Sequence, residues 1–314
     1  MSVHRGGEPG GEADVLVLGG AGIDTIVRVP SVPLPVKDAI SVPPIYDYVG
    51  HTGAAVAFAC HTLGLRTELV DVVGDDDPGR LVRRRFDHAG IPYTFVQHPS
   101  GTRRSVNLVG ADGVRLALYD GRHPADTFVD PALYHAAIGR ARHVHVSIMS
   151  WARHAFVVAR QAGRETSTDL HDWDGEADYH RTFAEQADIV FMSTAALGDR
   201  VDEVAGRILE RGRARVVVAL AGADGCRFTV PGSGTRAIPA VELPDMPVVD
   251  TNGAGDAFVA AFLYAHLAGL PWDRAAEAGV VAGAFACGSP GTADAFIDAE
   301  RLRSELRERT GQPS

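Results

Sequence analysis

The chain has 314 residues, 46% of them hydrophobic and 22% charged, so it can bury a large core, and extended disorder is excluded. Its formal net charge of −10 argues against a nucleic-acid partner, and no stretch reaches the ~18 apolar residues of a membrane span. Cys60, Cys226 and Cys287 stand in apolar contexts, which suits buried free thiols in the cytoplasm. The Gly-rich, polar segment 1–13 has no apolar run of a signal peptide and is predicted to be a loose tail.

Apolar, β-branched runs alternate with helical patterns from residue 14 onward. Strands are predicted at 15–18, 67–73, 143–147, 165–170, 188–192 and 215–220. Helices are predicted at 53–63, 78–89, 153–162 and 199–211, and from about 253, 273 and 298. This repetition of strand and helix indicates a mostly parallel sheet covered by helices on both faces.

Two segments interrupt the alternation. Residues 26–49 carry five prolines among alternating apolar residues, and residues 93–118 are typical of short strands with a hairpin turn at Ala111-Asp112-Gly113. Neither segment has helical periodicity. Both are therefore predicted to pair as a small β-sheet outside the main layer.

The first predicted strand ends in a glycine-rich loop, Gly19-Gly20-Ala21-Gly22, followed by Asp24. A dinucleotide-binding fingerprint is excluded, because Thr25 stands where the third glycine belongs and prolines follow where that fingerprint requires a helix. Asp24 is either a ligand-binding carboxylate at a strand end or a solvated turn residue.

Asp256 stands directly behind a glycine turn that opens an apolar helix. The small residues Gly253, Ala254 and Gly255 let backbone N–H groups approach a ligand, and the helix dipole favours negative charge at that point. Asp256 can accept a proton from a substrate hydroxyl while these N–H groups stabilise charge on a transferred group. The alternative is that Asp256 only caps the helix.

The run Asp250-Thr251-Asn252-Gly253-Ala254-Gly255-Asp256 resembles the C-terminal signature of the ribokinase-like, or PfkB, family of carbohydrate and nucleoside kinases. The segment Gly50-His51-Thr52-Gly53, continuing to Gly74-Asp75-Asp76, is similar to a second family segment. The resemblance implies an α/β fold, a ribokinase-like three-layer sandwich with a mostly parallel central sheet, over residues 14–309. In such a fold the insertions 26–49 and 93–118 form a small β lid.

The resemblance also implies roles for individual residues. Asp256, Gly253, Ala254 and Gly255 match the catalytic turn. The acceptor site is expected to contain Asp24, Gly50, His51, Thr52 and Gly53, and the nucleotide site Ser193, Gly222, Gly225, Asn252 and Gly283. His51 replaces a common glycine and Ala55 replaces a common asparagine, which favours a non-ribose sugar or a nucleoside as acceptor.

Phosphoryl transfer requires Mg²⁺ to neutralise charge on the nucleotide phosphates. Many relatives carry Asn-x-x-Glu for this purpose where this chain has Ser193-Thr194-Ala195-Ala196. Asp169 is the replacement candidate, although its acidic segment is equally typical of a solvated loop. Relatives that need K⁺ bind it beside a loop that corresponds here to Asp250, Ser289 and Gly291.

These observations predict an ATP-dependent kinase that transfers the γ-phosphate to a hydroxymethyl group of a sugar, with Asp256 as general base and an anion hole at the helix N-terminus. The first alternative is an adenosine-like nucleoside kinase, which Asn252 favours. The second is a catalytically weak, sugar-binding regulatory protein, motivated by the missing Asn-x-x-Glu. The predicted partners are a small-molecule acceptor and a second copy of the chain bound through the lid.

Overall fold

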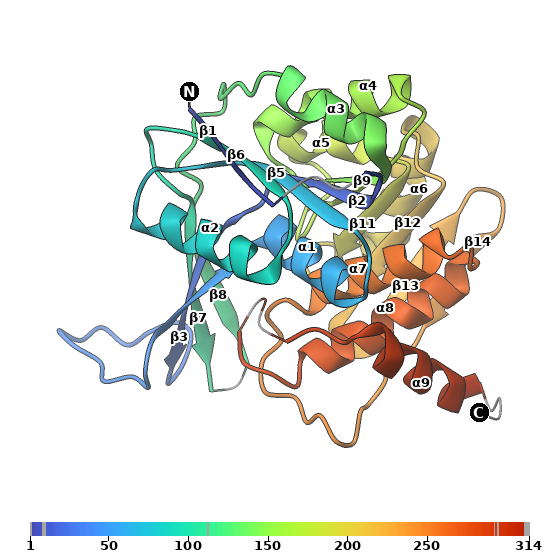
Figure 1. The fold of residues 1–314 in the computed structure, drawn as a ribbon. Helices are drawn as coiled ribbons and strands as arrows, with labels where there is room; N and C mark the ends of the chain where they lie inside the picture. The colour runs from blue at the N-terminus through green and yellow to red at the C-terminus, as the bar shows by residue number, and fades with distance from the viewer. Residues whose placement is uncertain (1, 8–10, 112, 292, 294, 311–314) are drawn as a thin grey trace.

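The computed structural model describes residues 2–7, 11–111, 113–291, 293 and 295–310. They form a large sheet with helices on both faces and a small second sheet at one side (Figure 1). Within this described part, no helix is both long enough and apolar enough to cross a membrane.

The large sheet contains most of the strands. Their bounds are β1 (Val3–Gly6), β2 (Ala13–Leu18), β5 (Thr67–Val73), β6 (Tyr93–Gln97), β9 (Ala141–Val146), β10 (Glu165–Asp169), β11 (Ile189–Ser193), β12 (Val216–Leu220), β13 (Cys226–Val230) and β14 (Gly234–Ile238). The order across the sheet is β1-β6-β5-β2-β9-β10-β11-β12-β13-β14. Neighbours from β6 to β12 are parallel, and β1, β13 and β14 add antiparallel edges.

Helices cover both faces of this sheet. One face carries α1 (Thr52–Thr62), α2 (Asp77–Ala89), α7 (Ala254–Leu267), α8 (Trp272–Ala286) and α9 (Ala299–Thr310). The other carries α3 (Ala132–Arg140), α4 (Ala155–Gln161), α5 (Asp178–Gln186) and α6 (Val201–Arg211). On β2, Val15 and Val17 pack toward the first set, whereas Leu16 and Leu18 pack toward the second, because successive side chains point to opposite faces. The predicted three-layer α/β fold is confirmed.

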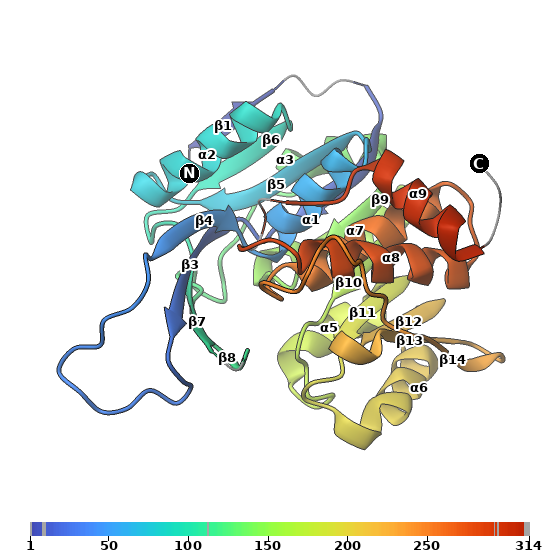
Figure 2. The same ribbon diagram turned by 90° about the horizontal axis from the view of Figure 1, so that it is seen from below.

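The small sheet has the order β4-β3-β7-β8. Its strands are β3 (Gly22–Val29), β4 (Tyr46–Gly50), β7 (Arg104–Gly110) and β8 (Arg115–Asp120). Figure 2 shows it beside the main body, with the loop between β3 and β4 projecting outward. Strands β7 and β8 are antiparallel, as the hairpin pattern predicts, and Asp112 of the predicted turn lies outside the described residues.

The bounds of this small sheet differ from the predicted segments 26–49 and 93–118. Strand β3 starts at Gly22 and so includes Asp24. Strand β6 lies in the large sheet, between β1 and β5, because Tyr93 and Phe95 pack against Phe86 of α2 in the core.

The prediction of a loose tail over residues 1–13 is wrong in two places. Val3–Gly6 forms β1 and pairs antiparallel with β6, and β2 already begins at Ala13. The physical reason lies in β6, which would otherwise present a row of unpaired backbone groups at the edge of the sheet. Cys60 and Cys226 are buried, Cys287 is partly buried, and all three are free.

Candidate functional site

The predicted site residues gather where the parallel strands end. Asp169 is the last residue of β10 and Ser193 the last residue of β11, and the glycine-rich loop follows β2. In open α/β sheets this carboxyl edge is the usual place for ligands. The N-terminus of α7 carries Asp256 and approaches the same edge, because Gly255 lies beside Leu220 at the end of β12.

Asp256 is the third residue of α7. The residue before the helix is Gly253, whose φ of 77° is in the left-handed region, and the helix itself begins at Ala254. Asp256 is therefore not the N-cap residue, contrary to the capping alternative. Burial raises the pKa of Asp256 well above its usual range, and the charges of Asp169 and Asp24 raise it further. Three carboxylates from three separate elements thus converge on one region.

Asp24 lies on the inner face of the small sheet, defined here as the face that carries Asp24 and Tyr119. The cross-strand register puts Tyr48, Asp24, Ser105 and Tyr119 in one row across β4, β3, β7 and β8. Arg28 follows Asp24 by four residues on the same strand and shares this face, because side chains alternate with a period of two.

The predicted acceptor residues Gly50, His51, Thr52 and Gly53 lie together beside Asp24. Gly50 pairs with Gly22 at the end of β4, and the backbone N–H of His51 donates to Asp24 Oδ2 at 2.9 Å. Thr52 is the first residue of α1. A Cβ atom at Gly53 would stand 1.8 Å from the carbonyl oxygen of Gly19, so glycine is required for the start of α1 to approach the loop after β2.

The predicted nucleotide residues lie at the same edge of the sheet. Ser193 pairs with Leu220, and the turn after β12 holds Gly222 and Gly225 at φ values of 56° and 87°. Gly283 of α8 faces the backbone of Ala254, where an added Cβ would lie 3.3 Å from the carbonyl oxygen.

Asn252 is buried and shapes the loop before α7. Its backbone N–H and its side-chain amide both donate to Asp250 Oδ1, at 3.0 and 2.7 Å. The other oxygen of Asp250 accepts from the backbone N–H of Gly291 at 3.5 Å. The structure therefore brings Asp250 against the loop that contains Ser289 and Gly291.

No group of three or more His, Cys, Asp or Glu side chains among the described residues could hold a metal ion. Of the acidic segment after β10, Asp169 is the carboxylate whose charge acts on Asp256. Asp174 instead accepts backbone N–H groups of its own turn, and Glu176 pairs with Arg207. The solvated-loop interpretation thus fits this segment beyond Asp169.

Two arginines of the small sheet reach the loop before α7, and the sequence analysis did not identify either of them. Arg28 of β3 contacts Asp250, and Arg115 of β8 donates to Asn252 Oδ1 at 3.0 Å. Asp24 and Arg28 are four residues apart in one strand, and side chains separated by an even number of residues lie on the same face of a sheet. This spacing could have identified Arg28 from the sequence.

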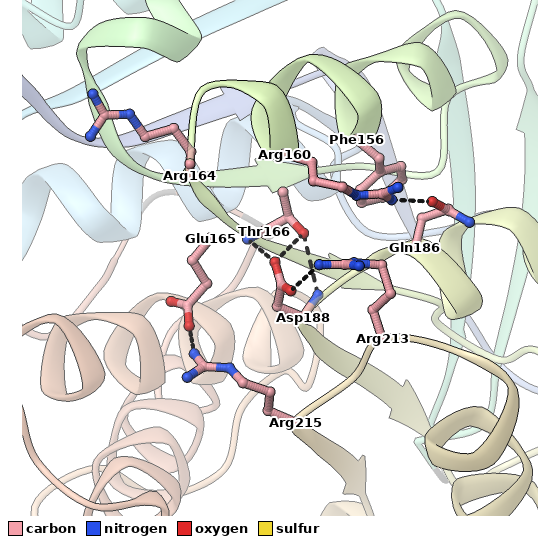
Figure 3. Close-up of a pocket in the computed structure, with 10 residues that line it drawn as sticks. Phe156, Arg160, Arg164, Glu165, Thr166, Gln186, Asp188, Arg213 and Arg215 are labelled. Carbon is pink, nitrogen blue, oxygen red and sulfur yellow. Dashed lines mark hydrogen bonds and ion pairs between the residues drawn. The ribbon is translucent and has the colours of Figure 1, made fainter.

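A separate pocket of about 330 Å³ opens at the amino ends of β10, β11 and β12, at the opposite edge of the sheet. Figure 3 shows Arg160, Arg213 and Arg215 beside it, each with a partner among the lining side chains. It lies away from Asp256, so we do not assign it to the same site.

Comparisons with known proteins agree with this geometry. Residues 13–299 match the family described as pfkB family carbohydrate kinase. An acarbose 7(IV)-phosphotransferase from Actinoplanes sp. is 47% identical over 290 residues, covering 92% of this chain and 97% of that protein.

Solved structures show the same likeness. A microbiome-derived acarbose kinase superposes with a TM-score of 0.88 at 54% identity, covering 94% of this chain and 99% of the other. Ribokinase from Arabidopsis thaliana, solved with ribose and ATP, shares the fold with a TM-score of 0.79 at 19% identity, covering 94% of this chain and 99% of the other.

Proposed function

Because the chain belongs to the pfkB family of carbohydrate kinases, and is therefore a sugar kinase by homology, we propose that it uses ATP to phosphorylate acarbose or a closely similar acceptor. The high identity to two proteins named for that acceptor supports this choice over ribose. The observation that carries the proposal is the convergence of Asp256, at the N-terminus of α7, with Asp24 on the facing small sheet.

In the proposed reaction, Asp256 accepts the proton of an acceptor hydroxymethyl group as the oxygen of that group attacks the γ-phosphorus of ATP. The bond between the γ-phosphorus and the β,γ-bridging oxygen breaks, and ADP leaves. The backbone N–H groups of Ala254, Gly255 and Asp256 stabilise the negative charge on the transferred phosphoryl group. Asp24 accepts hydrogen bonds from acceptor hydroxyls and fixes the reacting group in place. The turn beside Gly222 and Gly225, together with Ser193, Asn252 and Gly283, borders the nucleotide.

The protein side chains suit a metal that arrives with the nucleotide. Magnesium keeps several waters and binds one or two carboxylates in addition to phosphate oxygens, and Asp169 is such a single carboxylate. When bound, Mg²⁺ neutralises charge on the phosphates. We also propose that K⁺ binds beside the loop of Asp250, Ser289 and Gly291. Activity measured with K⁺ replaced by Na⁺ or choline tests this proposal.

An acceptor panel tests the proposed function. Initial rates would be measured with ATP and Mg²⁺ on acarbose, fructose, ribose and adenosine, with Asp256→Asn as the inactive control. Preferred turnover of acarbose supports the proposal, whereas preferred turnover of adenosine supports the nucleoside kinase. Acarbose binding without any turnover would identify a regulatory protein instead.

The outer face of the small sheet supports a proposed homodimer through the lid. Leu116 and Leu118 of β8 point away from the inner face and are 46% and 54% exposed. A second copy would cover this apolar strip, with both copies in the cytoplasm, where ATP and reduced thiols are found. Light scattering on the wild type and on Leu118→Glu tests it, and a monomeric wild type would contradict it.

A further inference from the structure

His51 has a backbone conformation that is unusual for a residue with a side chain. Its φ is 64° and its ψ is 160°, a region that is essentially restricted to glycine. Such strain persists only where the surrounding structure holds it, and it concentrates at functional sites. Glycine would adopt this conformation freely, so the histidine side chain requires an explanation.

The surroundings of His51 fix both its backbone and its ring. The backbone N–H donates to Asp24 Oδ2 at 2.9 Å. The ring lies so close to Gly22 that a Cβ atom there would stand 2.2 Å from His51 Cδ2. On its other side the ring meets Tyr119 edge to face, with centroids 5.8 Å apart and an interplanar angle of 76°. His51 therefore connects the start of α1 with β8, the edge strand of the small sheet that carries Tyr119.

The imidazole has an unused polar atom that faces the acceptor residues. The side chain of His51 is 9% exposed, and its Nε2 finds no hydrogen-bond partner within the described part of the chain. It lies 3.8 Å from Asp24 Oδ1, which is too long for a hydrogen bond. Thr52 Oγ1 is a second such atom, in the next residue. Buried polar atoms are nearly always satisfied, so this pair indicates a missing ligand.

The chemistry of the site indicates which ligand fits. Burial lowers the pKa of His51, so the ring is neutral and offers one N–H donor and one lone pair. Asp24 offers only acceptors. Neighbouring hydroxyl groups, each both donor and acceptor, satisfy such a set, and the C–H face of a sugar ring packs against an aromatic ring such as Tyr119.

We propose that His51 is a specificity residue of the acceptor site, which binds a hydroxyl of a saccharide beside Asp24 and holds the small sheet over that saccharide through Tyr119. This inference rests on the proposed function, because it names the group that recognises the same acceptor. It explains why a strained histidine occupies a position where glycine would be more stable.

We expect His51→Gly to make the protein more stable and to weaken acceptor binding. The melting temperature should rise, because the strain is relieved, while the acceptor KM rises about 3- to 10-fold, the loss of one neutral hydrogen bond. The KM for ATP should stay within twofold. A purely structural role would leave the acceptor KM unchanged, and that result would overturn the inference.

Two further variants separate the loss of the histidine side chain from the backbone flexibility that a glycine introduces. His51→Asn should recover part of the acceptor affinity, because asparagine tolerates positive φ and carries a polar amide. Tyr119→Leu should raise the acceptor KM without changing the melting temperature, because Tyr119 is 57% exposed. Equal acceptor affinities for His51→Asn and His51→Gly would contradict a hydrogen bond from the ring.

Calorimetric titration with acarbose separates this inference from the proposed function. Acarbose binding without turnover, weakened in His51→Gly, would refute the kinase function and support the role of His51. Turnover of acarbose with a KM that His51→Gly leaves unchanged would support the kinase function and refute the role of His51. Binding of adenosine in place of every saccharide tested would overturn both.

Discussion

Arg28 Nη2 on β3 lies 3.2 Å from Oδ2 of Asp250, a carboxylate whose side chain is fully buried and which follows 222 residues later in the chain. A second bond joins Arg115 on β8 to Asn252, two residues after Asp250. Both arginines extend from the inner face of the small sheet to the loop that leads into α7. The position of the sheet and the geometry of this loop are therefore physically linked.

Replacing Arg28 should loosen that link. In Arg28→Ala, we expect amide exchange in residues 22–50 to become faster and kcat/KM for the acceptor to fall, because a lid that docks less well excludes water less well. The unfolding free energy should fall by more than the ~1 kcal/mol typical of exposed ion pairs, because Asp250 is fully buried and loses its charged partner. Exchange mass spectrometry and kinetics measure both effects.

Arg80→Ala serves as the control for Arg28→Ala, because it removes an arginine that pairs with Asp77 on the exposed side of α2. It should alter neither exchange in the small sheet nor activity. Unchanged exchange in Arg28→Ala would show that other contacts hold the sheet in place.

Asp256→Asn should abolish most activity and leave the fold intact. General-base catalysis contributes ~10²–10⁴-fold, and the amide cannot accept the proton. Because the pKa of Asp256 is raised in the folded state, the folded state loses stability as the pH rises from the ordinary pKa of an aspartate toward the raised value. Removing the ionisable group should therefore not lower the melting temperature at pH 7. Asp273→Asn, in the first turn of α8, is the matched control. Turnover within threefold of wild type would rule out Asp256 as the base.

Asp24→Asn should separate the two ligands. A hydrogen bond to a charged group contributes ~1.5–3 kcal/mol, so acceptor affinity should fall by about 10- to 100-fold while ATP affinity stays unchanged. Titration calorimetry with each ligand measures this directly. Loss of nucleotide binding with intact acceptor binding would mean that the two sites are assigned the wrong way round.

The parallel part of the fold was predictable because its strands are continuous apolar runs. Strand β5 was predicted with the bounds that the structure shows, since all seven of its residues are buried. The missed elements carry weaker signals: α5 buries only Phe183 and Ala184 among its described residues, and every residue of β14 is exposed or half-buried. Strand β1 was missed because four exposed or half-buried residues next to glycines carry no clear pattern.

The candidate site was predictable only where chemistry and local sequence coincide. Asp256 follows a glycine turn, and the sequence marks it as a candidate for that reason. The strained backbone of His51 could not be read from the sequence, because its contacts with Asp24, Gly22 and Tyr119 exist only in the tertiary fold. The link from Arg28 to Asp250 is of the same kind, since no local pattern relates residues so far apart.

The pH dependence of the reaction should show that the charge of Asp169 acts on Asp256. Only ionised Asp256 can act as a base, so kcat/KM should fall as the pH falls through its raised pKa, above the usual range of an aspartate. Because the negative charge of Asp169 helps to raise that pKa, Asp169→Asn should lower it. The acidic limb of the profile should then move to lower pH.

Asp174→Asn is the matched control for this shift, since Asp174 lies on the same segment but is exposed and bonded to its own turn. Its profile should coincide with that of the wild type. Mg²⁺ titrations at fixed ATP show whether Asp169 also holds the metal, in which case the midpoint rises in Asp169→Asn and not in Asp174→Asn. An acidic limb that stays in place in Asp169→Asn, with Mg²⁺ saturating, would mean that Asp169 does not act on the base, because removing a nearby negative charge must lower the pKa of the carboxyl group it opposes.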